Sequence, residues 1–163
     1  MRQILESSRE QVIPLEMEIN ILENYLSIEQ FSHSAQFTWK ITTDTAIEKS
    51  TTGILPMLIH PFVENAVIHG VTPKGTDGNI LINFSKEKEQ LIVTVSDNGI
   101  GRERALQRKA QQDQHHKSTA LLVVQERLEL LEGKTHIQVL DLVDADGAAC
   151  GTEVTVILPW MEV

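Results

Sequence analysis

The sequence predicts an α+β fold, a two-layer sandwich whose mixed sheet of about five strands carries helices on one face. Apolar residues recur with helical spacing in segments of both halves of the chain. Segments rich in β-branched residues stand between and after these helices, and two of them are separated by only a short polar turn. Such a mixed order of strands and helices is typical of a sandwich with its helices gathered on one side of the sheet.

The first elements in chain order are a helix, a strand and a second helix. An amphipathic helix is predicted over about residues 15–30, with Pro14 at its start and an apolar face of Leu15, Ile19, Leu22 and Leu26. Another short helix before it would contain Ile4, Leu5, Val12 and Ile13. Residues 37–42 alternate like a strand, and Gly53 precedes a second helix that ends near Gly70. The apolar stripe of this second helix consists of Leu55, Ile59, Phe62 and Ala66.

The second half of the chain contains two strand pairs with a helical region between them. Residues 80–87 and 90–97 are β-rich, and the polar KEKE between their cores suits a hairpin of adjacent antiparallel strands. A polar, Gln-rich segment follows, and then a helical face that stops at Gly133. Residues 136–142 and 153–158 form two last strands, joined by the turn-like DADGAACG.

Length and composition indicate one globular domain. The chain has 163 residues, of which 41% are hydrophobic and 23% charged. Lys and Arg total 14 against 23 Asp and Glu, a formal charge of −9, so no nucleic acid partner is expected. The single Cys150 excludes an internal disulfide and a Cys-based zinc site. No apolar run is long enough to span a bilayer, and the first residues lack the apolar core of a signal peptide.

The most informative segment is PFVENAVIHG, residues 61–70. On a helix, Asn65 and His69 lie one turn apart on the same side, with Glu64 beside them. Carboxylate and amide oxygens suit Mg²⁺, and Glu64 could also accept a proton from a nucleophile. The alternative is a solvated helix face whose C-terminal His complements the helix dipole, and the spacing alone favours neither.

Two further segments could shape a ligand site. In SDNGIG, residues 96–101, Asp97 at a strand end can accept a hydrogen bond from an amino group such as that of adenine. Gly99 and Gly101 let the backbone turn sharply and approach a ligand closely, although Asp-Asn-Gly is also a common turn. Thr152 would present its hydroxyl beside the same ligand if its strand neighbours that of Asp97, and is otherwise only the start of a strand.

These three segments occur in the order, and at roughly the spacing, of the N, G1 and G2 boxes of the GHKL ATPase superfamily, which they resemble. More narrowly, LPMLIHPFVENAVIHG and LEMEINILENYLSIEQ resemble the corresponding signatures of LytS/YehU-type sensor histidine kinases. VSDNGIG is similar to their G1 box, and HKSTALLVVQERLELLEGK is similar to their lid and the helix after it. The resemblance covers residues 15–159.

The resemblance implies the Bergerat ATP-binding fold, with ATP and Mg²⁺ bound by the motif residues. Asn65 would be the Mg²⁺ ligand, and Glu64 the catalytic base or a carboxylate that organises the metal. Asp97 would bind the adenine amino group, Gly99 and Gly101 would shape the lid, and His69 and Thr152 would border the nucleotide, with Thr152 at its adenine end.

The lid is expected in the polar segment 102–119, whose few apolar residues give little packing to keep it ordered without ligand. Lys117, Ser118 and Thr119, at a helix start, can offer charge, hydroxyls and N–H groups to phosphate, or can simply cap the helix. Ile68 replaces a Lys that relatives often have, and Ala120 replaces the usual lid glycine, so a modest resting affinity is expected.

By this resemblance the chain is the ATP-binding catalytic domain of a two-component sensor histidine kinase. It would transfer the γ-phosphate of Mg-ATP to a histidine on an upstream helix, since none of its six histidines sits in an acceptor motif. Residues 1–32 would be the tail of the dimerisation and phosphoacceptor helices, and residues 33–163 the ATP-binding domain. Implied partners are a second copy, through the upstream helices, and a response regulator of the LytTR type. The domain would be the cytoplasmic part of an inner-membrane protein, with the membrane segments upstream.

Two other functions remain open from the sequence. A stand-alone protein-serine kinase of the anti-sigma type would need no upstream histidine, but the resemblance of the N-terminal helix argues against it. A degenerate nucleotide-binding or interaction module is suggested by Ile68 and Ala120. Nucleotide binding separates this module from both kinases.

Overall fold

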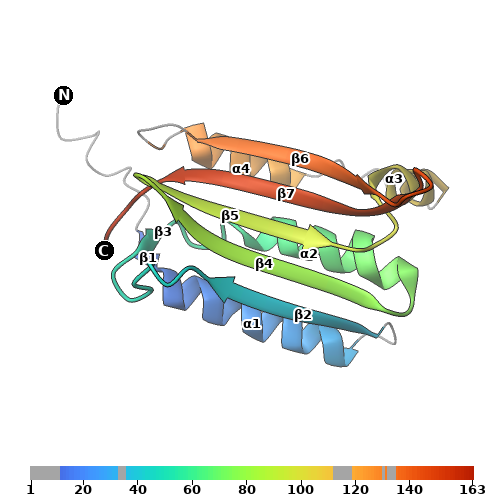
Figure 1. Ribbon diagram of the computed structural model, residues 1–163, viewed down its shortest axis with the longest axis horizontal. Coiled ribbons are helices and arrows are strands. Elements are labelled where there is room, and N and C mark those ends of the chain that lie inside the picture. Colours follow the sequence, from blue (N-terminus) through green and yellow to red (C-terminus); the bar gives the residue numbers. More distant parts are fainter. Residues whose placement is uncertain (1–11, 33–35, 112–118, 130, 132–134) are drawn as a thin grey trace.

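A mixed five-stranded sheet forms one layer of the molecule, with the strand order β2-β4-β5-β7-β6 (Figure 1). The computed structural model describes residues 12–32, 36–111, 119–129, 131 and 135–163. β2 (Phe37–Thr43) pairs in parallel with β4 (Gly78–Glu87). The remaining neighbours are antiparallel and include β5 (Gln90–Asp97), β7 (Ala149–Pro159) and β6 (His136–Val143). The predicted mixed sheet and its central hairpin are confirmed.

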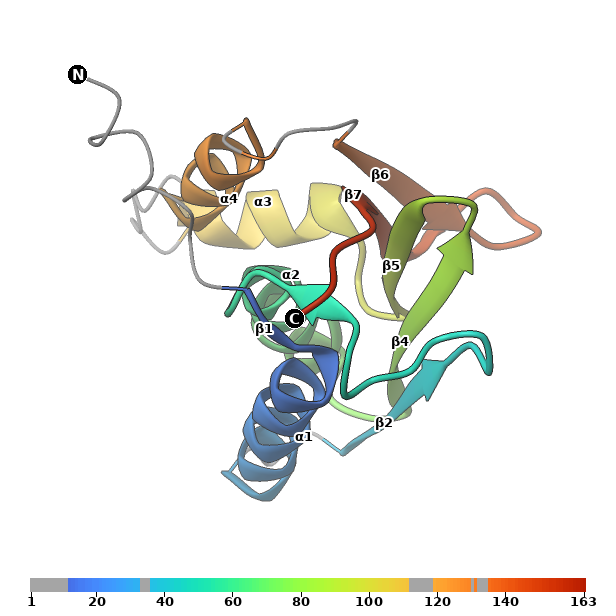
Figure 2. The ribbon, with the colours of Figure 1, turned by 90° about the vertical axis from the view of Figure 1, so that its left-hand side faces the viewer.

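The second layer consists of helices on one side of this sheet (Figure 2). These helices are α1 (Leu15–Ser32), α2 (His60–Asn65), α3 (Arg102–Gln111) and α4 (Thr119–Glu129). The sandwich with helices on one face is therefore as predicted. None of the helices in the described ranges is both long and apolar enough to cross a membrane.

The second predicted helix starts later in the structure than its apolar spacing suggested. Leu55 precedes α2, which begins at His60 with Pro61 in its first turn, and Met57 in between has a left-handed φ of 58°. Pro61 lacks an N–H and fits only the first turn of a helix. The helical path then continues as a π-helical segment, Ala66–Val71, and a 3₁₀ turn, Thr72–Lys74. Apolar spacing extended the prediction too far because it does not distinguish a buried turn from a helix.

The chain before α1 also differs from the prediction. Ile13 and Pro14 form a short strand, β1 (Ile13–Pro14), rather than a helix. β1 pairs antiparallel with β3 (Gly53–Ile54), outside the main sheet. Val12 is half-buried against the core, whereas Ile4 and Leu5 lie outside the described residues.

One hydrophobic core joins the two layers. The apolar face of α1 is buried in this core, together with side chains of α2 and the inner face of the sheet. The stripe predicted for the second helix is buried throughout: Leu55 is 1% exposed, Ile59 0%, Phe62 2% and Ala66 4%. Packing of these side chains places the polar edge of α2 and its π-helical continuation beside the ends of β5 and β7.

Candidate functional site

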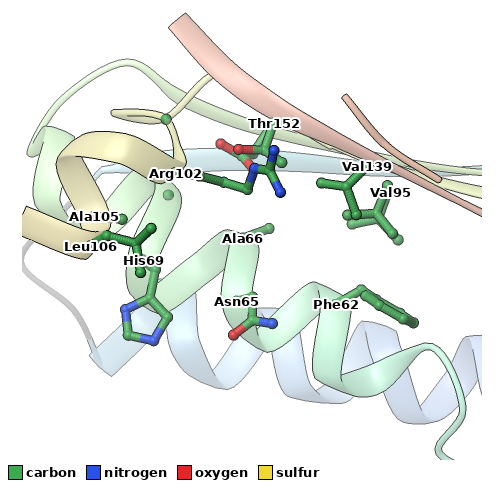
Figure 3. A pocket seen from close by; sticks show the side chains of 14 residues that line it. Phe62, Asn65, Ala66, His69, Val95, Arg102, Ala105, Leu106, Val139 and Thr152 are labelled. Carbon is green, nitrogen blue, oxygen red and sulfur yellow. The ribbon is translucent and has the colours of Figure 1, made fainter. Parts of the chain in front are cut away.

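A cavity of about 300 Å³ lies between the sheet and the helical segment that begins with α2 (Figure 3). Figure 3 shows the side chains of Phe62, Asn65 and His69 on one wall, and those of Thr152 and Val139 on the wall facing them. The start of α3 borders one end of the cavity. The lining residues are Phe62, Asn65, Ala66, His69, Gly70, Val95, Asp97, Gly101, Arg102, Ala105, Leu106, Val139, Thr152 and Val154. Most of this surface is apolar, so the few polar groups define how a ligand is oriented.

Asp97 is the buried charge of this cavity. It ends β5 directly opposite Thr152 of β7, and its side chain is 6% exposed. The backbone N–H of Gly99 donates a hydrogen bond to its Oδ1 at 2.8 Å. Burial raises the pKa of Asp97 to about 6, against hydrogen bonds from the Gly99 and Thr152 backbones that lower it. An ionised carboxylate here can accept hydrogen bonds but cannot donate one.

Three glycines allow the backbone to close around Asp97. A Cβ atom at Gly70 would lie 2.7 Å from Asp97 Oδ1, and one at Gly99 would lie 2.3 Å from the carbonyl carbon of Gly70. Gly151, with a φ of 144°, approaches the Asp97 carbonyl oxygen so closely that no Cβ atom fits. Of these three glycines, only Gly99 was predicted from the sequence to shape the site. Two features of the sequence could have indicated the other two glycines. Gly70 follows the apolar stripe of the predicted helix, and Gly151 precedes the last predicted strand.

The polar side chains of α2 and the π-helical segment, Glu64, Asn65 and His69, do not all face the cavity. Asn65 and His69 both line the cavity, in agreement with their predicted position on the same side of the helical path. Glu64 is exposed and is not among the lining residues. Its charge instead acts on Tyr25 and His60, whose rings pack with centroids 4.5 Å apart. Asn65 and His69 therefore share a surface that Glu64 does not.

The segment after Asp97 forms the end of the cavity nearest α3. Gly101 has a φ of 80°, a conformation that favours glycine, and Arg102 follows as the first residue of α3. The predicted lid is thus helical over Arg102–Gln111. Thr119 begins α4, while Lys117 and Ser118 lie outside the described residues.

Arg102 is a polar lining residue that the sequence analysis did not identify. Its Nε and Nη2 atoms donate hydrogen bonds to the two carboxylate oxygens of Asp141 on β6, each at 2.6 Å. No motif indicated this pair, because its members are far apart in the chain. In sequence, α3 and α4 lie between β5 and β6, and the contact appears only once β7 has placed β6 at the sheet edge.

No group of three His, Cys, Asp or Glu side chains comes together as a metal site within the described ranges. Mg²⁺ often keeps several waters and takes phosphate oxygens from a nucleotide, so one protein oxygen can suffice. The amide oxygen of Asn65 at the cavity wall fits that requirement.

An apolar cavity between a sheet and a helix, with one buried carboxylate at a strand end, can hold a ligand and accept a hydrogen bond from it. The model of the histidine kinase-, DNA gyrase B- and HSP90-like ATPases matches residues 54–162. The chain belongs to this family. It is an ATP-binding catalytic domain of the histidine kinase type, and the predicted family and Bergerat fold are confirmed.

Individual relatives agree with the family. The chain is 28% identical over 162 residues to the sensor histidine kinase YpdA of Escherichia coli K12, covering 98% of this chain and 26% of that protein. It is 29% identical over 160 residues to the sensor protein LytS of Bacillus anthracis, covering 95% and 26%. The chain thus spans about a quarter of the length of these curated relatives.

Solved structures show the same fold. The catalytic domain of the histidine kinase ThkA superimposes with a TM-score of 0.61 at 15% identity, over 91% of this chain and 94% of that chain. The histidine kinase AdeS of Acinetobacter baumannii superimposes with a TM-score of 0.56 at 11% identity, over 91% of this chain and 66% of that one.

Proposed function

We propose that this domain holds ATP in the cavity and presents its γ-phosphate to a histidine of the longer sensor kinase. One observation carries the proposal: the buried carboxylate of Asp97, fixed by the Gly99 N–H and placed opposite Thr152 on the neighbouring strand. A carboxylate held in this way accepts the adenine amino group and rejects the guanine oxygen. Thr152 supports the adenine end of the nucleotide.

The phosphates and Mg²⁺ lie toward Asn65 and His69 in this proposal. Asn65 is the protein ligand of Mg²⁺, and His69 borders the nucleotide one turn further on. When bound, Mg²⁺ would neutralise phosphate charge. Gly99 and Gly101 shape the lid, and Lys117, Ser118 and Thr119 contact phosphate from the lid end.

Phosphoryl transfer requires positioning and charge neutralisation more than covalent help from the protein. The bond between the γ-phosphorus and the β-phosphate oxygen breaks, a bond from phosphorus to an imidazole nitrogen forms, and ADP leaves. Glu64 is the base that takes the imidazole proton. Its exposed position outside the lined cavity is compatible with a substrate histidine that approaches from another segment.

In this proposal, the acceptor histidine, the dimerisation helices and the membrane segments belong to the longer protein. Residues 1–32 continue the dimerisation helices that carry the acceptor histidine, and residues 33–163 form the ATP-binding domain. A homodimer forms through the upstream helices, and the phosphate passes to a response regulator of the LytTR type. The kinase domain lies on the cytoplasmic side of an inner membrane that upstream segments cross. The match to sensor proteins such as LytS over nearly the whole chain supports this arrangement.

Calorimetric titration with ADP, ATP and GTP tests the nucleotide site. ADP and ATP should bind and GTP should not, and Asp97→Asn should weaken ATP binding by about 1–3 kcal/mol, the cost of breaking a buried hydrogen bond to a charged group. Equal binding of ATP and GTP would refute the adenine site at Asp97.

Incubation with γ-labelled ATP tests the direction of transfer. The chain alone should bind ATP but incorporate no stable phosphate, because none of its six histidines sits in an acceptor motif. A separate fragment with the upstream helix should become labelled weakly, since an intramolecular contact has become a bimolecular one. Label on this chain that survives acid would favour a serine kinase. Label on it that survives base but not acid would identify one of its own histidines as the acceptor.

A further inference from the structure

Arg102 and Asp141 form a clamp between the first residue of α3 and the edge strand β6. Both hydrogen bonds of the pair are 2.6 Å long, and they join Nε to Oδ1 and Nη2 to Oδ2. Such a bidentate pair fixes the plane of the guanidinium as well as its position. The hydrogen bond from Arg102 lowers the pKa of Asp141, so the carboxylate stays ionised well below neutral pH.

The clamped guanidinium belongs to the wall of the nucleotide cavity. Arg102 lines the cavity together with Gly101 and Thr152, and its side chain remains 50% exposed although it is paired. Its partner Asp141 is the register partner of Thr152 in the neighbouring strands β6 and β7, and Figure 3 shows Arg102 on the same wall as Thr152. Since Asp97 and Thr152 are register partners in neighbouring strands, Arg102 lies at the end of the cavity where Asp97 would hold a base.

A planar cation at this place has two ways to contact a nucleotide, through the face of the base or through the phosphates. The surroundings favour the base. The charge of Arg102 is already compensated by Asp141, which leaves less attraction for phosphate. The neighbouring lining side chains Val95, Val139 and Val154 are apolar and suit a ring rather than an anion.

We propose that the guanidinium of Arg102 stacks on the adenine ring bound at Asp97, and that Asp141 is the positioning residue that keeps the guanidinium in the stacking plane. The assignment rests on the proposed nucleotide site and adds to it a binding residue from the start of α3. Guanidinium planes stack on aromatic faces, and the contact is worth more where one partner is pre-organised. The clamp also ties α3 to the sheet at the edge of the cavity.

The test compares adenosine, ADP and ATP as ligands of variants at Arg102, Arg104 and Asp141, by calorimetry or by displacement of a fluorescent ADP analogue. Arg102→Ala should weaken binding of all three ligands by the same factor, about 3- to 10-fold. Arg102→Lys should lose nearly as much, because an ammonium keeps the charge but has no plane. Arg104→Ala, an exposed residue of the same helix outside the cavity lining, is the matched control and should bind like the unaltered chain.

Asp141→Asn tests the positioning role. It should weaken adenosine binding while Arg102 is present and have no further effect in the Arg102→Ala background, because the carboxylate acts only through the guanidinium. Asp141→Glu, which can restore the pair, should recover part of the affinity. Thermal unfolding without nucleotide should be similar for all variants, which separates the effect from loss of fold.

Three outcomes would overturn the stacking assignment. Unchanged adenosine binding by Arg102→Ala would show that the guanidinium does not touch the base. A loss that grows from adenosine to ATP and is rescued by Arg102→Lys would show a phosphate contact instead. Additive effects of Asp141→Asn and Arg102→Ala would remove the positioning role. If the unaltered chain bound none of the three ligands, the nucleotide site itself would fail, and this result differs from every one of the others.

Discussion

Gly70 lies so close to Asp97 that a Cβ atom at Gly70 would stand 2.7 Å from Oδ1 of the carboxylate. The contact joins the end of the π-helical segment to the end of β5, and the N–H of Ile100 donates to the Gly70 carbonyl at 3.2 Å in the same place. Asp97 is therefore positioned from two sides, by the hydrogen bond from Gly99 and by the bare backbone of Gly70. The carboxylate has little room to move.

Gly70→Ala should displace this carboxylate and weaken ADP binding by about tenfold or more. The added methyl group has to push against a buried, hydrogen-bonded side chain, and overpacking of this kind costs about 1–3 kcal/mol. Calorimetry with ADP measures the loss. Gly147→Ala is the control, because Gly147 has a φ of 78° but nothing within 4 Å, so this variant should lose stability and keep its affinity. Equal ADP affinity of Gly70→Ala and the unaltered chain would contradict the close contact.

Nucleotide binding should weaken as pH falls through about 6, the pKa to which burial raises Asp97. The ionised carboxylate is the stronger acceptor for the adenine amino hydrogen, and protonation weakens this acceptor and adds a competing O–H donor. ADP affinity measured between pH 5 and 8, at about constant ionic strength, should be flat above pH 7 and fall below 6. The affinity of Asp97→Asn should show no such fall. A flat profile for the unaltered chain would rule out Asp97 as the titrating acceptor.

The same pKa also predicts how the empty domain responds to pH. The folded-state pKa of Asp97 lies above the ordinary value of 3.8, so the folded chain holds this proton more tightly than the unfolded chain. The contribution of Asp97 to stability is therefore greatest at low pH and is lost as pH rises from about 4 to 6. Thermal unfolding at pH 7.5 should find Asp97→Asn at least as stable as the unaltered chain. A clear loss of stability in this variant would contradict the raised folded-state pKa of Asp97.

Substitutions of Asn65 and Glu64 should affect metal binding and proton transfer separately. Asn65→Ala should abolish the Mg²⁺ dependence of ATP affinity, because the amide oxygen at the cavity wall is lost. Glu64→Gln should leave affinity mostly intact and lower phosphoryl transfer in the longer kinase. Lys40→Ala, an exposed residue of β2 outside the cavity lining, is the control for both measurements. Loss of nucleotide in Glu64→Gln as complete as in Asn65→Ala would place Glu64 in the metal shell instead.

Glu18 should contribute to stability through the loop that starts α2. Its fully buried carboxylate accepts hydrogen bonds from the Met57 N–H at 2.9 Å and the Ile59 N–H at 3.4 Å. Glu18→Ala leaves these buried donors unpaired and should lower the free energy of unfolding by about 1–3 kcal/mol. Denaturant unfolding measures the change, with the exposed Glu16→Ala in the same helical turn as the control. Similar effects of the two substitutions would show that the loop does not depend on Glu18.

The sequence by itself determined the five strands of the main sheet and the helix α1, but not the short strand β1 or the start of α2. Apolar spacing fixed α1 and the buried face of α2, and the β-rich runs fixed the hairpin of β4 and β5, because these signals depend on neighbours within a few residues. The order of the motif segments also pointed to Asn65, His69, Asp97 and Thr152, which the structure brings to one cavity. Such local patterns can be recognised in a single sequence.

Only the tertiary structure decided how these residues face one another. The separation of Glu64 from Asn65 depends on which side of α2 faces the cavity, and the Gly70 contact with Asp97 needs both the π-helical turn and the end of β5. The pair of Arg102 and Asp141 needs the strand order that places β6 at the sheet edge. Contacts between residues distant in the chain depend on how whole elements pack, and no local periodicity records that packing.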